Sequence, residues 1–425
     1  MKLAKSLFLG SVAGLAAVAG AQAADLPAKK AAAVEYVRVC STYGAGFFYI
    51  PGTETCLRVG GRVRAEYQYL EPTAREDNSI GFRARGRLNL DARTATAYGL
   101  LRTFVRFDIT HNTGTYGGDT AIVDQAFVQF GGLTAGRTVS FWDNSDLPTG
   151  HFGTLRFSDA PTVNVLAYTF SFGNGFSATL SLEEGRYAGV GDDVLIRSGT
   201  AFAAGQRAPD VVGNLKYAGT WGTAQLSAAA HQIRSNVLGV APGEDYGVFN
   251  GTIPDDEYGW AVSFQGSVNL PMLGAGDALW LAATYADGAL AYLGTGSSIT
   301  VGNLSGPVID GFIGLDGDIE TGEGWSVAGG LRHYWTPTIR QNVFGSYASI
   351  EYSGVPLLTG VAAGDFDFKE WRLGTNVIWS PVAGLDIGVE VLYANIDTDQ
   401  LRNIDGRLVD DDDAWEGRLR IQRDF

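Results

Sequence analysis

The stretch LRVGGRVRAEYQY, residues 57–69, decides the fold class. Its side chains alternate in character, because the odd positions carry mostly Leu, Val, Ala and Tyr and the even positions carry mostly Arg, Glu and Gln. A period of two indicates a β-strand with one apolar and one polar face. Strands of soluble proteins usually have about 5 to 6 residues, whereas a tilted strand that crosses a bilayer needs about 9 to 11. The length of this stretch therefore favours a transmembrane strand.

The same alternation recurs along the chain, and together the segments predict about sixteen strands. The further segments are residues 80–91, 98–110, 122–131, 133–139, 163–172, 176–184, 210–217, 223–234, 259–270, 278–287, 324–335, 338–351, 368–379, 385–396 and 413–425. Tight connections, such as residues 173–175 and 336–337, alternate with long ones, such as residues 185–209, 235–258 and 288–323. Short turns at one rim and long loops at the other are typical of bacterial outer-membrane barrels.

The final segment, EGRLRIQRDF at residues 416–425, predicts how such a sheet closes. Its last residue, Phe425, has the same parity as the apolar Leu419 and Ile421. An open edge in lipid would leave backbone groups unsatisfied at several kcal/mol each, so the last strand is expected to pair with the first. Phe425 would then face lipid in an aromatic girdle at the membrane interface.

We therefore expect an all-β chain that forms a transmembrane antiparallel β-barrel, with short periplasmic turns and long extracellular loops. A soluble protein made of two packed sheets is the alternative, because packing would also cover the apolar faces of the strands.

The N-terminus has the features of a secretory signal peptide. Lys2 and Lys5 precede an apolar run over residues 7–19, and Ala21-Gln22-Ala23 provides a small-x-small cleavage site. We expect a signal peptide at residues 1–23, an N-terminal segment at residues 24–56 and the barrel at residues 57–425. Removal of the two signal lysines would change the formal net charge from -15 to -17.

Cys40 and Cys56 are the only two cysteines of the chain. In the oxidising compartment that the signal peptide implies, such a pair most simply forms a disulfide. The closed loop of about 15 residues would be worth up to ~3 kcal/mol in the chain-entropy model. We interpret the pair as a structural clasp near the short-turn rim, and a redox function is the alternative.

Several segments resemble one known family. They are ADLPAKK at residues 24–30, VEYVRVCSTYGAGFFYIPGTETCLRVGGRVRAEY at residues 34–67, AFVQFGGLTAGRTVSFWD at residues 126–143, and the terminal Phe425. These segments are similar to the general porins of alphaproteobacterial outer membranes. The resemblance implies a sixteen-stranded barrel, a homotrimer, and passive diffusion of small hydrophilic solutes, with the third long loop folded into the pore.

Arginines on the polar parity of neighbouring strands predict a basic wall inside the barrel, since neighbouring strands lie about 4.8 Å apart. These residues are Arg58, Arg62, Arg64, Arg83, Arg85, Arg87, Arg102, Arg106, Arg418 and Arg420. The loop after Gly136 carries Asp143, Asp146 and Asp159. If this loop enters the lumen, as the resemblance implies, its carboxylates would face the arginines across a charged pore constriction. The alternative is that the arginines only face water in the lumen.

The sequence leaves the ion preference open. Acidic stretches at residues 255–257 and 410–413, expected in long loops, favour cations at the mouth, whereas the arginines oppose them. On these charges we expect a preference for cations. The run at residues 410–413 could bind a divalent ion, but it lacks the Gly and the distal Glu of an EF-hand loop, and a solvated loop is the simpler interpretation.

Catalytic chemistry is poorly supported by the sequence. The four histidines, His111, His151, His231 and His333, lack metal-ligand spacing, and there is no P-loop, GxSxG elbow or dinucleotide fingerprint. We expect no enzymatic activity, no cofactor, no metal and no nucleic-acid partner. His151 falls in the inward loop and could make conductance depend on pH, although an ordinary loop histidine is the simpler interpretation.

These observations favour a passive diffusion channel for ions and small hydrophilic solutes in the bacterial outer membrane. Expected partners are outer-membrane lipid, lipopolysaccharide and two further copies of the chain. A substrate-specific channel, an outer-membrane hydrolase with a Ser/His site, and an adhesin that uses the long loops are the alternatives.

Overall fold

The computed structural model describes residues 38–186, 188, 204–235, 255–313, 318–352, 366–404 and 407–425. The predicted signal peptide at residues 1–23 lies outside these residues. The chain divides into two compact units, Met1–Cys56 and Leu57–Phe425. In the described part of the chain, no helix has the length and apolar character required to span a bilayer.

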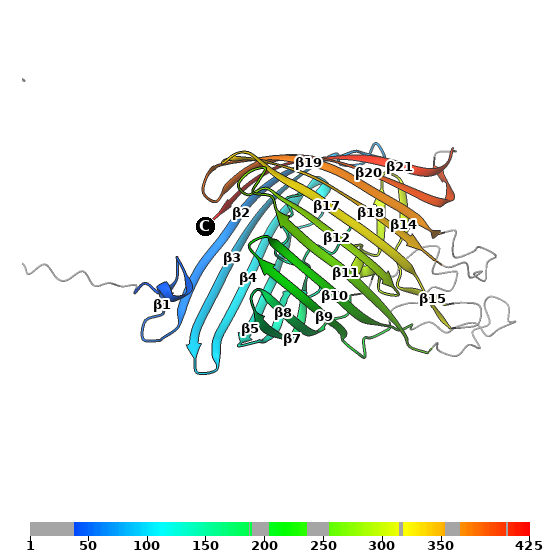
Figure 1. Ribbon diagram of the computed structural model, residues 1–425. Coiled ribbons are helices and arrows are strands. Elements are labelled where there is room, and N and C mark those ends of the chain that lie inside the picture. The colour runs from blue at the N-terminus through cyan, green and yellow to red at the C-terminus, as the bar shows by residue number, and fades with distance from the viewer. Residues whose placement is uncertain are drawn as a thin grey trace, which may run out of the picture. The chain divides into compact units, whose positions relative to one another are not determined.

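Sixteen long strands among the described residues of the second unit form one closed antiparallel sheet (Figure 1). They are β2 (Cys56–Leu70), β3 (Ile80–Thr96), β4 (Gly99–Thr113), β5 (Thr120–Phe130), β6 (Leu133–Val139), β7 (Thr162–Gly173), β8 (Phe176–Glu183), β9 (Asp210–Gly219), β10 (Gly222–Ile233), β11 (Glu257–Asn269), β12 (Ala278–Asp287), β17 (Glu323–Thr336), β18 (Ile339–Glu351), β19 (Phe368–Val382), β20 (Leu385–Ile404) and β21 (Arg407–Asp424). Each strand pairs with the next along the chain, and β21 pairs with β2. The predicted fold class and strand count are confirmed.

The pairing of β2 with β21 closes the barrel. The register runs from Arg62 opposite Asp424 to Leu70 opposite Glu416. Beyond it, the Phe425 N–H donates to the Gly61 carbonyl at 3.0 Å, and the Gly61 N–H donates to the Phe425 carbonyl at 2.9 Å. A Cβ atom on Gly61 would lie 2.6 Å from the Phe425 ring and 2.4 Å from a backbone oxygen. Glycine is therefore required at this close approach of chains.

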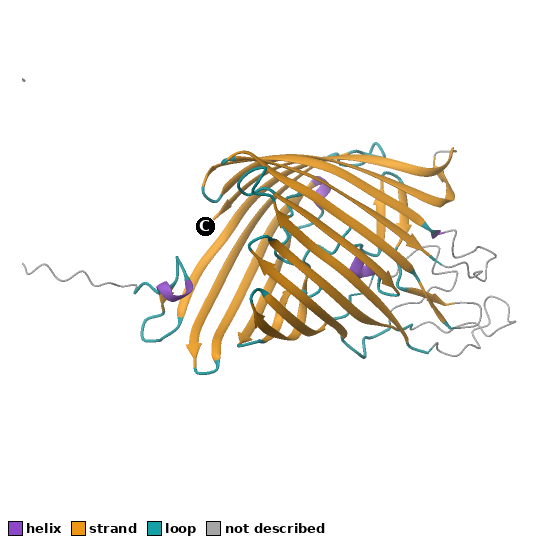
Figure 2. Cartoon of the chain, in the orientation of Figure 1, coloured by secondary structure: helices purple, strands orange, loops and turns teal. Residues whose placement is uncertain are grey.

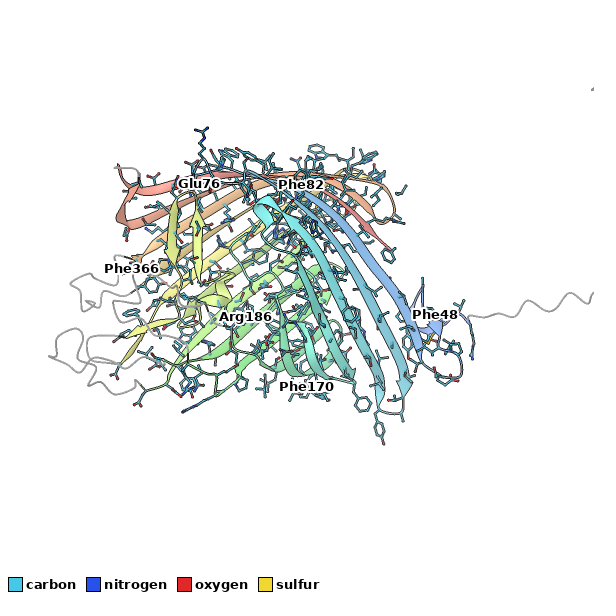
Figure 3. All side chains as sticks on the ribbon, turned by 180° about the vertical axis from the view of Figure 1, so that it is seen from behind. Phe48, Glu76, Phe82, Phe170, Arg186 and Phe366 are labelled. Carbon is cyan, nitrogen blue, oxygen red and sulfur yellow. A yellow bond between two sulfur atoms is a disulfide. The ribbon has the colours of Figure 1, made fainter. Side chains whose placement is uncertain are left out.

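The two faces of the strands differ as the parity predicts. On β7, Leu166, Tyr168 and Phe170 are exposed, whereas Val163 and Val165 on the other parity are buried. Figure 3 shows side chains on both faces of the strands, with Phe170 labelled. Aromatic rings contact one another across neighbouring strands near the long-loop ends. These pairs are Trp260 with Tyr285, Trp325 with Tyr347, and Tyr393 with both Trp371 and Trp415.

Strands dominate the described residues, and the helices given for this part of the chain are short 3-10 turns (Figure 2). These are η1 (Ser41–Tyr43), η2 (Gly114–Tyr116) and η4 (Leu290–Leu293). The connection between β12 and β17 contains two further hairpins, which the sequence pattern did not predict. They are formed by β13 (Ser298–Val301) with β14 (Leu304–Pro307), and by β15 (Gly311–Ile313) with β16 (Ile319–Thr321).

The prediction that residues 410–413 form a long loop is wrong. Strands β20 and β21 continue past their predicted ends, so the four aspartates lie within β21. Pairing resumes after a register shift between Asp397 and Arg402. Backbone pairing therefore continues through an acidic segment, because the hydrogen-bonding groups of the main chain do not depend on side-chain charge.

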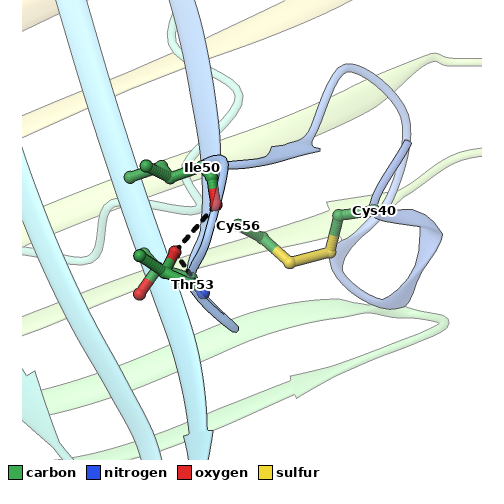
Figure 4. The surroundings of a disulfide bond; sticks show 5 residues. Cys40, Ile50, Thr53 and Cys56 are labelled. Atoms are coloured by element: carbon green, nitrogen blue, oxygen red, sulfur yellow. Dashed lines mark hydrogen bonds between the residues drawn. A yellow bond between two sulfur atoms is a disulfide. The ribbon is translucent and has the colours of Figure 1, made fainter. Parts of the chain in front are cut away.

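In the first unit, Cys40 and Cys56 form the predicted disulfide, with Cα atoms 5.9 Å apart (Figure 4). Both cysteines and Phe47 are buried in a small apolar cluster. The Cys40 N–H donates to the Phe47 carbonyl at 2.9 Å, and the Thr53 hydroxyl donates to the Ile50 carbonyl at 3.0 Å. The same unit contains the short strand β1 (Phe48–Tyr49).

Candidate pore and its inward loop

The third long connection on the loop rim, residues 140–161 between β6 and β7, enters the lumen and is called here the inward loop. Its contacts identify its path. The Asn144 N–H donates to Gln265 on β11 at 2.7 Å, and Asn376 on β19 donates to the Gly150 carbonyl at 2.7 Å. The loop is thus hydrogen-bonded to strands that are distant from β6 and β7 in the sheet. This path agrees with the prediction that the third long loop folds into the pore.

One face of the inward loop is apolar and packed against the wall. Trp142 is fully buried, with its ring 4.7 Å from that of Tyr292 in η4. Leu155 and Phe157 are also buried and join a cluster with inward residues of β12, β17, β18 and β20. Burial of these three large apolar side chains fixes the position of the loop.

Polar contacts fix the backbone of the same loop. Both carboxylate oxygens of Glu390 on β20 accept backbone N–H groups, from Phe152 at 2.6 Å and from Gly153 at 2.5 Å. The buried Arg156 Nε donates to Glu370 on β19 at 2.9 Å. These contacts satisfy backbone and charged groups that burial would otherwise destabilise.

The three predicted loop aspartates have three different environments. Asp143 is buried, with Arg186 Nη1 4.0 Å away, and burial raises its pKa to about 6 against the opposing effect of Arg186. Asp146 pairs with Lys216 on β9 at 2.7 Å. Only Asp159, with a half-exposed side chain 3.6 Å from His151, lines a cavity together with predicted wall arginines.

The expectation that all three carboxylates face the arginine wall is therefore wrong for Asp143 and Asp146. The physical reason is local. The apolar face of the loop turns Asp143 towards the packed side, and Lys216 offers Asp146 a closer cation than the wall does.

Most of the predicted arginines are neutralised by the wall itself. Arg87 donates twice to Asp108 at 2.7 Å, and Arg102 donates twice to Asp91 at 3.0 Å. Such bidentate pairs are the stronger type of ion pair. Further pairs join Arg62 with Asp424, Arg83 and Arg420 with Glu66, Arg106 with Asp124, and Arg418 with Glu416.

Three predicted wall arginines form no ion pair with a described carboxylate. Arg85 donates to the Thr110 hydroxyl at 3.0 Å, and Arg64 donates to the Gln422 side-chain oxygen at 2.9 Å. Arg58 is exposed. The sequence interpretation did not pair the arginines with the wall carboxylates Asp91, Asp108 and Asp124. Asp91 and Asp108 lie on the inward-facing parity, whereas Asp124 has the parity of the outward Val128 and Phe130 and contacts Arg106 at a register shift that parity does not reveal.

Two cavities meet at the inward loop. One, of about 540 Å³, has Asp159, Arg186 and Thr295 in its lining and lies towards the long loops. The other, of about 410 Å³, has Tyr334 and Asp386 in its lining and lies towards the short turns. Four residues line both cavities: Arg64, His151, Phe152 and Arg420. The Arg420 guanidinium lies 4.1 Å from the centre of the Phe152 ring.

Known proteins resemble the chain over most of its length. Residues 25–418 match the family model described as the porin subfamily. The chain is 32% identical to porin Omp2b of Brucella suis over 444 residues, which cover 99% of each chain. It is also 32% identical to porin Omp2b of Brucella abortus, again over 99% of each chain.

Solved structures share the fold at lower sequence identity. The outer membrane channel DcaP of Acinetobacter baumannii has a TM-score of 0.63 at 18% identity, with 89% of this chain and 99% of that chain covered. OmpT of Vibrio cholerae, in its trimer form, has a TM-score of 0.52 at 12% identity, with 88% and 100% covered. The family model and the Omp2b relatives lead to one conclusion: this chain belongs to the porin subfamily.

Proposed function

We propose that solutes crossing this outer-membrane diffusion channel pass a charged constriction between Arg64 and Arg420 on the wall and residues 151–159 of the inward loop. The porin subfamily and the Omp2b relatives support the channel and its location. One observation carries the constriction: the two lumen cavities have Arg64, His151, Phe152 and Arg420 in common.

The charges at this point support a transverse field. Arg64 contributes positive charge from the wall, and Asp159 contributes negative charge from the loop, whereas the charge of Arg420 is paired with Glu66. Farther along the wall, Arg87 and Arg102 are bonded to carboxylates, which weakens their field in the lumen. Opposed charges across a narrow aqueous passage orient water and disfavour apolar solutes, while the width of the passage limits solute size.

Single-channel recording in planar bilayers tests this proposal. Arg64→Gln should shift the potassium-to-chloride permeability ratio towards potassium, and Asp159→Asn should shift it towards chloride, because each removes one charge from the passage. Arg75→Gln, which removes a charge from the exposed connection between β2 and β3, serves as the control. Equal permeability ratios in all four proteins would reject the constriction, and absence of conductance steps from folded protein would reject the channel.

We further propose that the channel is a homotrimer that contacts outer-membrane lipid and lipopolysaccharide. Exposed apolar side chains on the outer parity of the strands, such as Leu166 and Phe170, support both lipid contact and contact between subunits. Chemical cross-linking of the detergent-solubilised protein tests the trimer. A ladder that ends at two subunits would contradict it.

The porin relatives favour transport over catalysis. Within the described residues, no group of three His, Cys, Asp or Glu side chains could hold a metal ion.

A further inference from the structure

The cavity on the short-turn side contains an unusual number of guanidinium groups. Its lining includes Arg62, Arg64, Arg332, Arg340 and Arg420. Asp386 is the one carboxylate in the described lining. The formal net charge of the whole chain is -15, so the local charge has the opposite sign to the global one.

Three of these arginines have carboxylate partners. Arg340 bonds Asp386 at 2.6 Å. Arg62 and Arg420 bond Asp424 and Glu66, also at 2.6 Å, and neither of these carboxylates lines the cavity. The positive charges of these three guanidinium groups are therefore largely neutralised by neighbouring carboxylates.

The other two arginines have only neutral acceptors among the described residues. Arg64 Nε donates to the amide oxygen of Gln422 at 2.9 Å. Arg332 Nε donates to the backbone carbonyl of Gly276 at 3.0 Å. Neither forms an ion pair within the described part of the chain, so two positive charges in this cavity are compensated only in part, through the more distant carboxylates Glu66 and Asp277.

Nearby carboxylates are already engaged elsewhere. Glu66 interacts with Arg420 and Arg83. Asp277, beside the Gly276 carbonyl, accepts from His333 at 2.6 Å and from the Tyr334 N–H at 2.8 Å. Part of the charge of Arg64 and Arg332 therefore remains available to a solute.

We propose that this cavity is a binding subsite for small oxyanions, that is, for solutes that carry a phosphate or carboxylate group. This subsite deepens the proposed function, since it names a class of solutes for the same pore. A guanidinium presents a planar set of N–H donors that matches the geometry of phosphate and carboxylate oxygens. A volume of about 410 Å³ is sufficient for a small anion with part of its hydration shell.

The site would also favour passage rather than trapping. Arg64 lines both cavities, so an anion held at Arg64 and Arg332 on the short-turn side can be passed to Arg64 and Arg186 on the long-loop side. Conduction requires binding that is favourable enough for entry and weak enough for release. Consecutive guanidinium groups meet this requirement, because each one can accept the anion from the one before it.

The test is a titration of the open channel at pH 7.5 and constant ionic strength, with chloride replaced stepwise by inorganic phosphate or, in a separate arm, by succinate. In the native protein, we expect the chloride current to fall along a saturating curve. In the R64Q/R332Q variant, the concentration for half of this effect should rise at least about tenfold, because charged hydrogen bonds are lost. The R75Q variant should titrate like the native protein.

The outcomes separate the two anion sources and the two proposals. Saturation by phosphate alone or by succinate alone supports the subsite and identifies the group it accepts. A current that follows the chloride concentration linearly in both arms overturns the subsite, as does an R64Q/R332Q variant that titrates like the native protein. In both of these cases conductance steps are still present, whereas their absence from folded protein would overturn the diffusion channel itself. Should the double variant fail to fold, the single variants R64Q and R332Q replace it, and the native titration decides independently.

Discussion

The two faces of the inward loop are built on different principles. The packed face is held by Trp142, Leu155 and Phe157, all of which are almost completely buried. The open face presents Phe152 and Asp159 to the cavities. The packed face, together with the bonds from the loop backbone to Glu390 and from Arg156 to Glu370, determines where the loop lies. The side chains of the open face can therefore vary in chemistry without loss of the loop position.

The difference between the packed face and the open face can be measured with substitutions. Substitutions on the packed face should change stability and, through loop position, the pore. Substitutions on the open face should change permeation and leave stability almost unaffected. The following predictions test this separation, in order of decreasing effect on the free energy of unfolding.

The largest effect is expected for Trp142→Ala. Removal of a fully buried aromatic side chain from a packed core costs about 3 to 5 kcal/mol. The ring contact with Tyr292 would also be lost. We expect a lower midpoint of urea unfolding in detergent micelles, together with larger and noisier single-channel currents from a loosened loop. An unchanged midpoint would show that the packed face does not hold the loop.

The next effect depends on pH and concerns Asp143. Its pKa is about 6 in the folded protein because burial disfavours the charged form. A carboxyl whose pKa is raised on folding adds most to the free energy of unfolding when the pH is below its ordinary pKa of 3.8. This added stability is lost as the pH rises through about 6. Relative to Asp143→Asn, the native protein should therefore lose up to about 3 kcal/mol of stability between pH 4 and pH 8. Unfolding curves of both proteins across this range provide the measurement, and parallel pH profiles would contradict the prediction.

A smaller effect is expected for Arg156→Gln. The variant removes one partner of the buried Glu370, but Arg372 still contacts this carboxylate at 2.5 Å. We therefore expect a loss of about 2 kcal/mol, below the cost of a fully unpaired buried charge. The matched control is the double variant R156Q/E370Q, which should be no more stable than R156Q because it leaves the nearly buried Arg372 without its carboxylate partner. If R156Q is as stable as the native protein, this ion pair does not anchor the loop.

The smallest effect on stability is expected for Phe152→Leu on the open face. The substitution removes the contact between the ring and the Arg420 guanidinium, which is worth about 0.5 to 1 kcal/mol at a hydrated site. Single-channel conductance should nevertheless change, because Phe152 lines both cavities. A large loss of stability with unchanged conductance would invert the proposed roles of the two faces.

The periodicity of the sequence predicted the barrel well. Segments such as residues 57–69 and 80–91 alternate clearly, since one parity meets lipid and the other meets the lumen. The same signal fails within the connection between β12 and β17, where strands of 3 or 4 residues are too short to display a period. It also fails in the acidic part of β21, where both parities are charged.

The candidate site was predictable only in part. Parity identified the inward arginines, but their neutralisation by Asp91 or Asp108 depends on cross-strand register, which requires knowledge of the pairing. The different environments of Asp143 and Asp159 depend on which loop residues pack against the wall. Arg332 was missed because it is isolated in sequence from the arginines of β2 and β3, and only closure of the sheet brings it to the same cavity as Arg64.

Closure of the sheet also has a consequence for the folding pathway. The seam joins Arg62 to Asp424, residues that are 362 positions apart in the chain. Contacts of such long range form late, because the entropy of a large loop must be lost before they contribute. Until then, the growing sheet has two unpaired edges that can associate with other chains. Chaperones that shield these edges should therefore increase the yield of closed barrels far more than they increase the final stability.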